Sequence, residues 1–152
     1  MTTAVFVDST TLLYTQDRND PDKQARSTLW LKRLVASSTL VINLQVANET
    51  YAVVRRKPQF AHRRPAVRAF LQDLLMWATE PAANTALAEA WRLEDRYAIG
   101  FWDSMLLASA NQAGCAVFLS EDLNDGQVYG AVRAINPFRH APADVLGAAA
   151  RP

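Results

Sequence analysis

The sequence predicts an α/β domain organised around a mostly parallel sheet. Short apolar runs rich in β-forming residues alternate along the chain with longer segments of helical spacing. The runs show no polar alternation, which is typical of strands covered on both faces of a parallel sheet. Strands that alternate with helices indicate an α/β fold. A chain of 152 residues has the size of one ordinary domain.

Composition limits the classes of function. Hydrophobic residues make up 50% of the chain and charged residues 20%, which indicates a soluble globular domain. The net charge of +1 means that any nucleic-acid partner has to be argued from local charge. The single cysteine, Cys115, lies in an apolar run and is predicted to be a buried, unreactive thiol. One cysteine excludes a disulfide framework, and we expect a cytoplasmic protein because no leader or long apolar span is apparent.

The first predicted strand, residues 4–7, ends at Asp8. Ligands of open α/β sheets bind at the carboxyl ends of strands, which favours a functional position for this acid. Alternatively, Asp8 only caps the helix that carries Leu12 and Leu13, because Asp is a preferred capping residue. On this segment alone both interpretations stay open.

The next segments repeat the alternation. Residues 22–38 have helical spacing, residues 39–42 form a second buried-type strand, and a helix follows from about residue 45 to 57. Glu49 lies in the first turns of this helix. The helix dipole alone explains a glutamate there, so Glu49 is a weak candidate by itself.

Basic residues accumulate between residues 50 and 72, a stretch that contains no Asp or Glu. Pro58 breaks one helix and Pro65 begins the next, so the bases surround a helical corner. Such an excess is either a solvated face or the electrostatic footprint of a phosphate backbone. Six residues make up this basic corner: Arg55, Arg56, Lys57, Arg63, Arg64 and Arg68.

The second half of the chain supplies two further acids. A helix is predicted over residues 84–98, and Asp103 is predicted to open the next one. A third buried strand, residues 115–119, leads into the acidic loop of residues 120–126, which contains Asp122. Residues 132–135 form a last short strand, and the Ala- and Pro-rich segment after Phe138 is predicted to be a loose tail.

Four acids thus share one topological position. Given a parallel sheet with right-handed crossovers, Asp8, Glu49, Asp103 and Asp122 can converge at its carboxyl edge. Capping could explain each acid separately, but clustered carboxylates repel one another unless a cation compensates. A set of oxygen ligands without His or Cys favours Mg²⁺ or Mn²⁺ over zinc.

Several motifs carry a resemblance to a known family. They are Val7-Asp8-Ser9-Thr10, Asn48-Glu49-Thr50, Phe101-Trp102-Asp103-Ser104, Leu119-Ser120-Glu121-Asp122-Leu123 and Asn136-Pro137-Phe138. Over residues 4–138 the chain resembles PIN-domain proteins, and among them it is most similar to VapC-type ribonuclease toxins of bacterial toxin–antitoxin pairs. Many relatives have Asn where this chain has Thr10, so the hydrogen bonds near the first acid are expected to differ.

The resemblance implies a three-layer α/β/α PIN domain over residues 1–138, with a mostly parallel sheet of about four to five strands, and a tail over residues 139–152. It also implies a metal-dependent endoribonuclease toxin that is a homodimer and is inhibited by a small VapB-type antitoxin whose tail enters the acidic groove. Asp8, Glu49, Asp103 and Asp122 carry over as metal-site acids, with Asp125 as a possible additional acid.

The expected chemistry is hydrolysis of an RNA phosphodiester by water activated on one or two Mg²⁺ ions. Ser9 and Ser120 have no nearby histidine in their motifs, so hydrogen bonding to a metal-ligating carboxylate is expected rather than nucleophilic attack. The basic corner is expected to guide RNA to the acids. Two alternatives stay open: a non-catalytic PIN-fold module that binds RNA or protein, and, less favoured because Thr10 replaces the required second Asp, an aspartyl-phosphate phosphatase.

Overall fold

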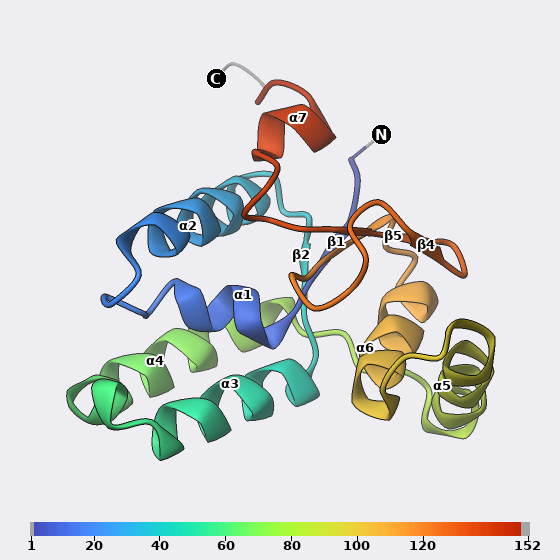
Figure 1. Ribbon diagram of the computed structural model, residues 1–152, viewed down its shortest axis with the longest axis horizontal. Helices are drawn as coiled ribbons and strands as arrows, with labels where there is room; N and C mark the ends of the chain where they lie inside the picture. The colour runs from blue at the N-terminus through green and yellow to red at the C-terminus, as the bar shows by residue number, and fades with distance from the viewer. Residues whose placement is uncertain (1, 150–152) are drawn as a thin grey trace.

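The computed structural model describes residues 2–149 and contains one five-stranded sheet (Figure 1). Its order is β2-β1-β3-β5-β4, and all pairs are parallel except the antiparallel pair of β4 and β5. The predicted mostly parallel sheet is therefore confirmed. The strands are β1 (Val5–Val7), β2 (Leu40–Val41), β3 (Val117–Leu119), β4 (Val128–Tyr129) and β5 (Val132–Ile135).

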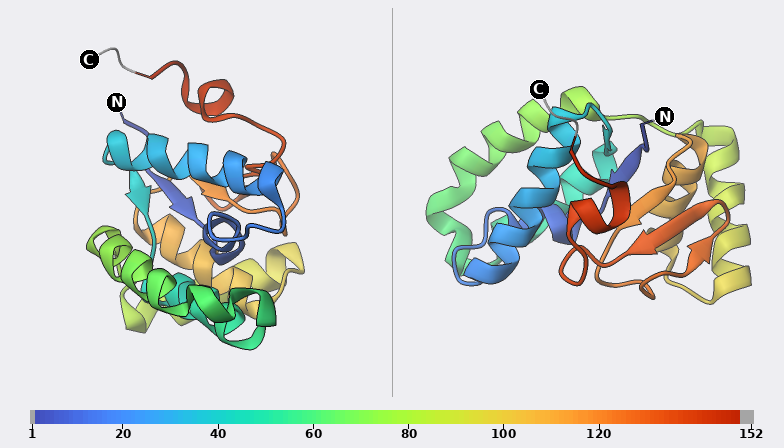
Figure 2. Two further views of the ribbon diagram at one scale, coloured as in Figure 1. Left: turned by 90° about the vertical axis from the view of Figure 1, so that its left-hand side faces the viewer. Right: turned by 90° about the horizontal axis from the view of Figure 1, so that it is seen from above.

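Helices cover both faces of this sheet. In the left view of Figure 2, α2 and α7 lie on one side of the strands, and α3, α4 and α6 lie on the other. This is the predicted three-layer α/β/α arrangement. The helices are α1 (Ser9–Tyr14), α2 (Pro21–Ala36), α3 (Leu44–Arg56), α4 (Arg64–Leu74), α5 (Ala83–Tyr97), α6 (Phe101–Gln112) and α7 (Pro142–Leu146), with the 3₁₀ helices η1 (Pro58–Arg63) and η2 (Leu75–Trp77). No helix within residues 2–149 has both the length and the hydropathy needed to cross a membrane.

The central strands explain the continuous apolar runs of the sequence. Every residue of β1 and β3 is buried, because helices pack on both faces. Phe6 and Phe118 are paired in register on these two strands, and their rings stack with centroids 5.3 Å apart. The core is therefore centred on the strands whose ends carry the first and the last candidate acid.

The position of β1 between β2 and β3 creates a switch point in the sheet. The chain moves from β1 to one side to form β2, and it returns later to form β3 on the other side. Immediately past the strand ends, the amide of Asp8 donates to the carbonyl of Leu119 over 3.1 Å. Crevices at such switch points are where open α/β sheets bind ligands.

One predicted boundary is wrong, and one strand was not predicted. The N-cap of α6 is Gly100, so Asp103 lies in the first helical turn and does not open the helix. Strand β4 was not predicted, because it has only two residues, Val128 and Tyr129, which are too few to form a recognisable apolar run. The β4–β5 turn contains Gly130 at φ +66°, and a Cβ there would lie 2.8 Å from Oδ1 of Asn111 on α6. Glycine at this turn thus permits the close packing of the hairpin on α6.

The segment after Phe138 is not loose throughout, contrary to the prediction. Helix α7 packs against α2, as Figure 1 shows. Nε1 of Trp30 donates to the carbonyl of His140 over 2.8 Å, and Arg33 donates to the carbonyl of Gly147 over 3.0 Å. These bonds attach the segment to the outer layer. Residues 150–152 of the predicted tail lie outside the described part of the chain.

Candidate active site

Asp8 lies at the centre of the candidate site, directly after β1. It is both the N-cap of α1 and almost fully buried, with 2% of its surface exposed. One carboxylate oxygen accepts from the backbone amide of Ser9 at 2.6 Å, and the other accepts from the hydroxyl of Ser120 at 2.8 Å. The two interpretations of this acid, cap and site residue, are therefore compatible, since the same bonds fix its orientation at the strand end.

Glu49 is connected to Asp8 through a serine. The hydroxyl of Ser9 lies 3.1 Å from Oε2 of Glu49 and 3.3 Å from Oδ1 of Asp8, so it can donate to either carboxylate. The other oxygen of Glu49, Oε1, accepts from Nε2 of Gln45 at 2.8 Å, one turn earlier on α3. Both oxygens of Glu49 are thus held by neighbouring side chains.

Asp122 reaches the same region from the loop after β3. Its backbone amide donates to the hydroxyl of Ser120 over 3.1 Å, and that hydroxyl in turn donates to Asp8. Its carboxylate accepts from the hydroxyl of Thr10 at 3.3 Å. Thr10, which departs from the family pattern, therefore contributes a hydrogen bond to the fourth acid. The side chain of Asp122 is exposed, so it forms the solvent side of the site.

Asp103 completes the set from the first turn of α6. It is partly buried, and this burial raises the pKa of its carboxyl group, with further increases from the negative charges of Asp122 and Glu49. Burial likewise raises the pKa of Asp8 to about 7; hydrogen bonds from Ser120 and Ser9 act in the opposite direction, and the charges of Asp103 and Asp122 add to the increase. All four candidate acids are therefore electrostatically coupled across the strand ends.

The donor chemistry of these acids fits a hard divalent cation. All four donors are carboxylates, which Mg²⁺ and Mn²⁺ prefer, and a cation would relieve their mutual repulsion. Within residues 2–149, however, no three or more Asp, Glu, His or Cys side chains are arranged so that they could hold one ion. The charges of the four acids can influence one another without such an arrangement, because electrostatic interaction acts over longer distances than the roughly 2.0–2.6 Å of a metal–oxygen bond.

Asp125, the possible additional acid, has other partners. One oxygen accepts from the backbone amide of Asn136 at 2.9 Å, and the other lies 2.7 Å from Nε2 of His140. Partial burial raises the pKa of Asp125, but these two hydrogen bonds and the charges of His140 and Arg139 outweigh it and lower the pKa overall. The carboxylate thus ties the acidic loop to the segment before α7.

The two loop acids are expected to behave differently when each is replaced by Asn. Asp122→Asn should reduce any metal-dependent cleavage by more than about a hundredfold. Loss of a residue that only hydrogen-bonds to a metal ligand costs roughly 10- to 100-fold, and loss of the ligand itself should cost more. Asp125→Asn should retain activity within a few-fold but lower the melting temperature. Initial cleavage rates and thermal unfolding of both variants check this. A larger loss of rate for Asp125→Asn would assign the ligand role to that acid.

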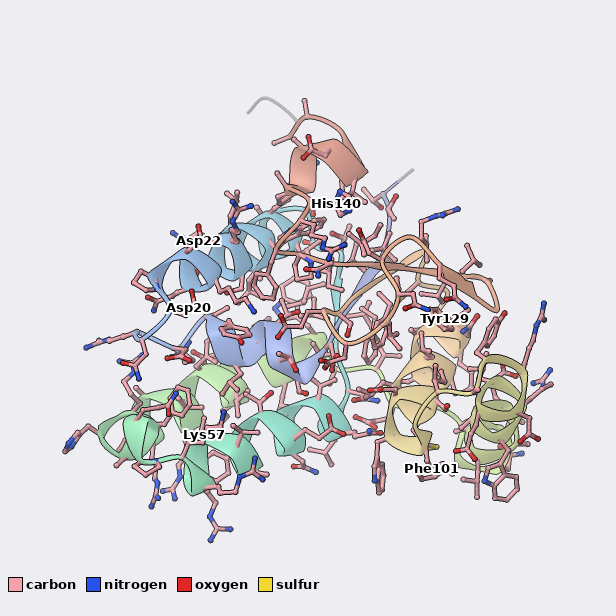
Figure 3. All side chains as sticks on the ribbon, in the orientation of Figure 1. Asp20, Asp22, Lys57, Phe101, Tyr129 and His140 are labelled. Carbon is pink, nitrogen blue, oxygen red and sulfur yellow. The ribbon has the colours of Figure 1, made fainter. Side chains whose placement is uncertain are left out.

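The basic corner divides into two groups. Arg55, Arg56 and Lys57, at the end of α3, are exposed. Arg64 and Arg68 are also exposed and Arg63 is partly buried, but all three have partners. Arg63 donates to Oε1 of Gln16 over 2.8 Å, Arg64 donates to the carbonyl of Arg55 over 2.8 Å, and Nε of Arg68 donates to the hydroxyl of Tyr51 over 2.6 Å. Helix α3 runs from the side of Phe101 to the corner at Lys57 (Figure 3). Arg55, Arg56 and Lys57 therefore lie about two turns beyond Glu49 along α3.

Two supporting contacts were not predicted from the sequence. Gln45 bonds to Glu49, and the i, i+4 spacing of the two residues on a predicted helix was a usable signal. Lys23 pairs with Glu121 at 2.8 Å and links α2 to the loop that carries Asp122. No local pattern indicates a pairing over 98 residues. The prediction for Cys115 is confirmed: it is buried, and burial raises the pKa of its thiol to about 12.

Comparisons with known proteins identify the fold independently of these residues. The model of the PIN domain family matches residues 5–129, whereas comparison with curated proteins gives no match. FitAcB from Neisseria gonorrhoeae is 15% identical with a TM-score of 0.64, over 90% of this chain and 99% of that one. DNA-bound VapBC from Salmonella typhimurium is 15% identical with a TM-score of 0.63, over 88% and 97%.

A third solved structure is that of VapC20 from Mycobacterium tuberculosis, a toxin that cleaves the sarcin–ricin loop. It is 19% identical with a TM-score of 0.58, over 86% of this chain and 99% of that one. At these identities the structural similarity concerns the fold alone. The family model covers most of the chain and includes Asp8, Glu49, Asp103 and Asp122. The chain belongs to the PIN-domain family.

Proposed function

We propose that this protein is a metal-dependent endoribonuclease and the toxin of a toxin–antitoxin pair. The observation that carries the proposal is the electrostatic coupling of four carboxylates at the switch point of a PIN-domain sheet. Burial, with a further contribution from the neighbouring negative charges, raises the pKa of Asp8 and Asp103, so their ionised forms are unfavourable at neutral pH unless a cation is bound. Perturbed carboxylates at a crevice are typical of functional sites.

Asp8, Glu49, Asp103 and Asp122 would hold Mg²⁺ or Mn²⁺. A divalent ion bound there would supply an activated water and charge stabilisation at the phosphodiester. Ser9, Ser120 and Gln45 keep two carboxylate groups, those of Asp8 and Glu49, in fixed orientations through the hydrogen bonds described above. Such outer partners preserve ligand geometry, and they give the two serines a role that requires no covalent intermediate.

The exposed bases of α3 would draw RNA toward the acids. A carboxylate cluster repels a polyanion, so productive binding requires positive charge nearby. Arg55, Arg56 and Lys57 are exposed and begin about 9 Å along α3 from Glu49. Arg63, Arg64 and Arg68 already donate to other groups of the protein, so we expect them to contribute less to phosphate binding than the first three.

The salt dependence of RNA binding tests this assignment. Replacing Arg55 and Arg56 together with Gln should weaken binding to unrelated single-stranded RNAs and flatten the slope of log K against log salt by about 1.4, since each phosphate contact contributes about 0.7. Fluorescence anisotropy at several salt concentrations measures the slope. The matched control replaces Lys32 and Arg139, two exposed bases away from α3, and should leave it unchanged. Equal slopes for the two double variants would contradict the assignment.

The toxin assignment adds two partners to the proposal. The similarity to VapBC, FitAcB and VapC20 supports a small VapB-type antitoxin as the inhibitor and a cytoplasmic RNA as the substrate. We also propose a homodimer as the active form, in line with the family resemblance of the sequence. Sedimentation velocity of the purified protein, alone and with the product of the adjacent small reading frame, measures both associations.

Cleavage itself is tested with purified protein and end-labelled RNA. Fragments should appear with Mg²⁺ or Mn²⁺, disappear with EDTA, and return when metal is added in excess. Regulated expression in a bacterium, with and without the adjacent small reading frame, followed by mapping of RNA ends, identifies the substrate. RNA binding without cleavage under every metal condition would favour the alternative, a non-catalytic PIN-fold binding module.

A further inference from the structure

A groove of about 630 Å³ opens beside the candidate acids. It is bounded by one side of α3, by Glu80 and by Trp102. Because Glu49 lines the groove and also belongs to the acid set, the groove adjoins the candidate metal site. Its volume lies within the roughly 300–1,000 Å³ that is usual for small-molecule and cofactor pockets. The α3 residues that line it are Leu44, Gln45, Asn48, Glu49 and Ala52.

Trp102 is the largest exposed side chain of this groove and directly precedes Asp103. The residue is 64% exposed, although an indole gains much more free energy from burial than a polar side chain does. Its ring contacts that of Phe101 edge to face, with centroids 5.1 Å apart. Its carbonyl accepts from Nε2 of Gln45 at 3.2 Å, which attaches the start of α6 to α3. The backbone of Trp102 is therefore attached to α3, and its indole lies against Phe101 beside the acid cluster.

The rim of the groove is rich in hydrogen-bond acceptors. Glu80 accepts from the backbone amide of Leu44 through Oε1 at 2.7 Å. This single bond leaves acceptor capacity on the Glu80 carboxylate, since an ionised carboxylate offers about four acceptor sites. Glu49 adds a second carboxylate to the lining. Amino groups complement such a rim, whereas phosphate oxygens are repelled by it.

We propose that the groove binds one unpaired base of the RNA, next to the phosphodiester that is cleaved, with the base stacked on Trp102. This inference rests on the proposed ribonuclease function. Stacking on an exposed aromatic ring is the common way in which proteins hold single-stranded bases. The acceptors of the rim favour bases with an exocyclic amino group, namely adenine, cytosine and guanine, over uracil.

The size of the groove argues against a protein partner as its main occupant. A stable protein interface buries about 800 Å² on each partner and involves about 20–30 residues a side. Seven residues line this groove, and two of them are large exposed apolar side chains, Leu44 at 50% and Trp102. One stacked base matches this scale. The experiment below also tests whether a second copy of the chain occupies this groove instead.

Binding is measured in an Asp103→Asn background, which prevents cleavage, with fluorescein-labelled 12-mers of adenylate, cytidylate and uridylate in Mg²⁺. Adding Trp102→Ala should weaken adenylate binding by roughly tenfold, within the range known for the loss of one base–aromatic stack. Trp102→Phe should restore most of it, because Phe preserves a stacking surface. Adenylate and cytidylate should bind several-fold more tightly than uridylate, and Glu80→Gln, which can still cap α3, should reduce this preference.

The matched control is Trp91→Ala, which removes a tryptophan of similar exposure, 52%, from α5 outside the groove. It should leave affinity and base preference unchanged. Unchanged affinity of Trp102→Ala, with clear RNA binding by the parent, would overturn the stacking proposal and leave the ribonuclease function intact. If the parent binds none of the three oligonucleotides, both proposals fail. Conversion of a dimer to a monomer by Trp102→Ala in light scattering would also overturn the proposal, because the groove would then be an interface between copies.

Discussion

Replacing Asp103 with Asn is expected to abolish RNA cleavage while the fold stays cooperative. Asn has nearly the same shape as Asp, and the helix does not depend on this side chain, because Gly100 is the N-cap of α6. The substitution removes one of four proposed ligand charges, so we expect the cleavage rate to fall by more than about a hundredfold. Initial rates on end-labelled RNA in Mg²⁺ and in Mn²⁺ measure the effect.

The control for this variant is stability without metal. Burial and the charges of Asp122 and Glu49 raise the pKa of Asp103, which means that its ionised form is unfavourable in the folded protein. Asp103→Asn should therefore leave the melting temperature in EDTA unchanged or raise it. A decrease of several degrees would indicate a structural role for Asp103. Full activity of the variant with either metal would exclude Asp103 from the metal site.

The second large effect expected is a loss of stability of the metal-free protein as the pH rises. The pKa of Asp8 is raised from 3.8 to about 7 in the folded state, so the folded protein binds this proton more tightly than the unfolded chain does. The resulting stabilisation is fully present below about pH 4 and is lost as the pH rises to about 7. Since one pKa unit corresponds to about 1.4 kcal/mol, the loss should amount to a few kcal/mol.

The variant Asp8→Asn isolates this contribution from those of the other acids. Urea unfolding in EDTA between pH 4 and pH 8 should show that the variant loses less stability than the parent over this interval. Added Mg²⁺ should stabilise the parent at pH 7.5 and have little effect on the variant, because a ligand stabilises the state that it binds. Parallel pH profiles of the two proteins would refute the raised pKa of Asp8.

The sequence was sufficient to predict the parts of the fold that depend on continuous local patterns. The runs at residues 5–7 and 117–119 are buried strands because both faces of the sheet are covered. Strand β4 has only two residues, and its pairing with β5 depends on a turn packed against Asn111. Helix α7 is short and is attached by Trp30 and Arg33 of a distant helix. Contacts of this kind leave no local pattern, so neither element was predicted.

The proximity of the first and last candidate acids was predictable because topology brings strand ends together. Asp8 and Asp122 follow two strands that are neighbours in the sheet, so a parallel arrangement alone places them near each other. The limits of the basic corner were not predictable in the same way. The charge pattern gives no sign that Arg63, Arg64 and Arg68 donate to Gln16, Arg55 and Tyr51. Only the three-dimensional structure shows that these arginines, unlike the bases at the end of α3, donate hydrogen bonds to other groups of the protein.

The neighbouring positions of β1 and β3 also have a consequence for protein synthesis. The hydrogen bond from Ser120 to Asp8 joins residues 112 positions apart, so it requires nearly the whole chain. At about 5–20 residues per second, the ribosome needs roughly 6–23 s between the synthesis of Asp8 and that of Asp122. Within this interval the growing chain gains Glu49 and Asp103, but it still lacks the loop that carries Asp122 and completes the set. Under the proposed ribonuclease function, the chain would be unable to cleave RNA while its first strands are still emerging from the ribosome, and cleavage would begin only after the last third of the domain has folded.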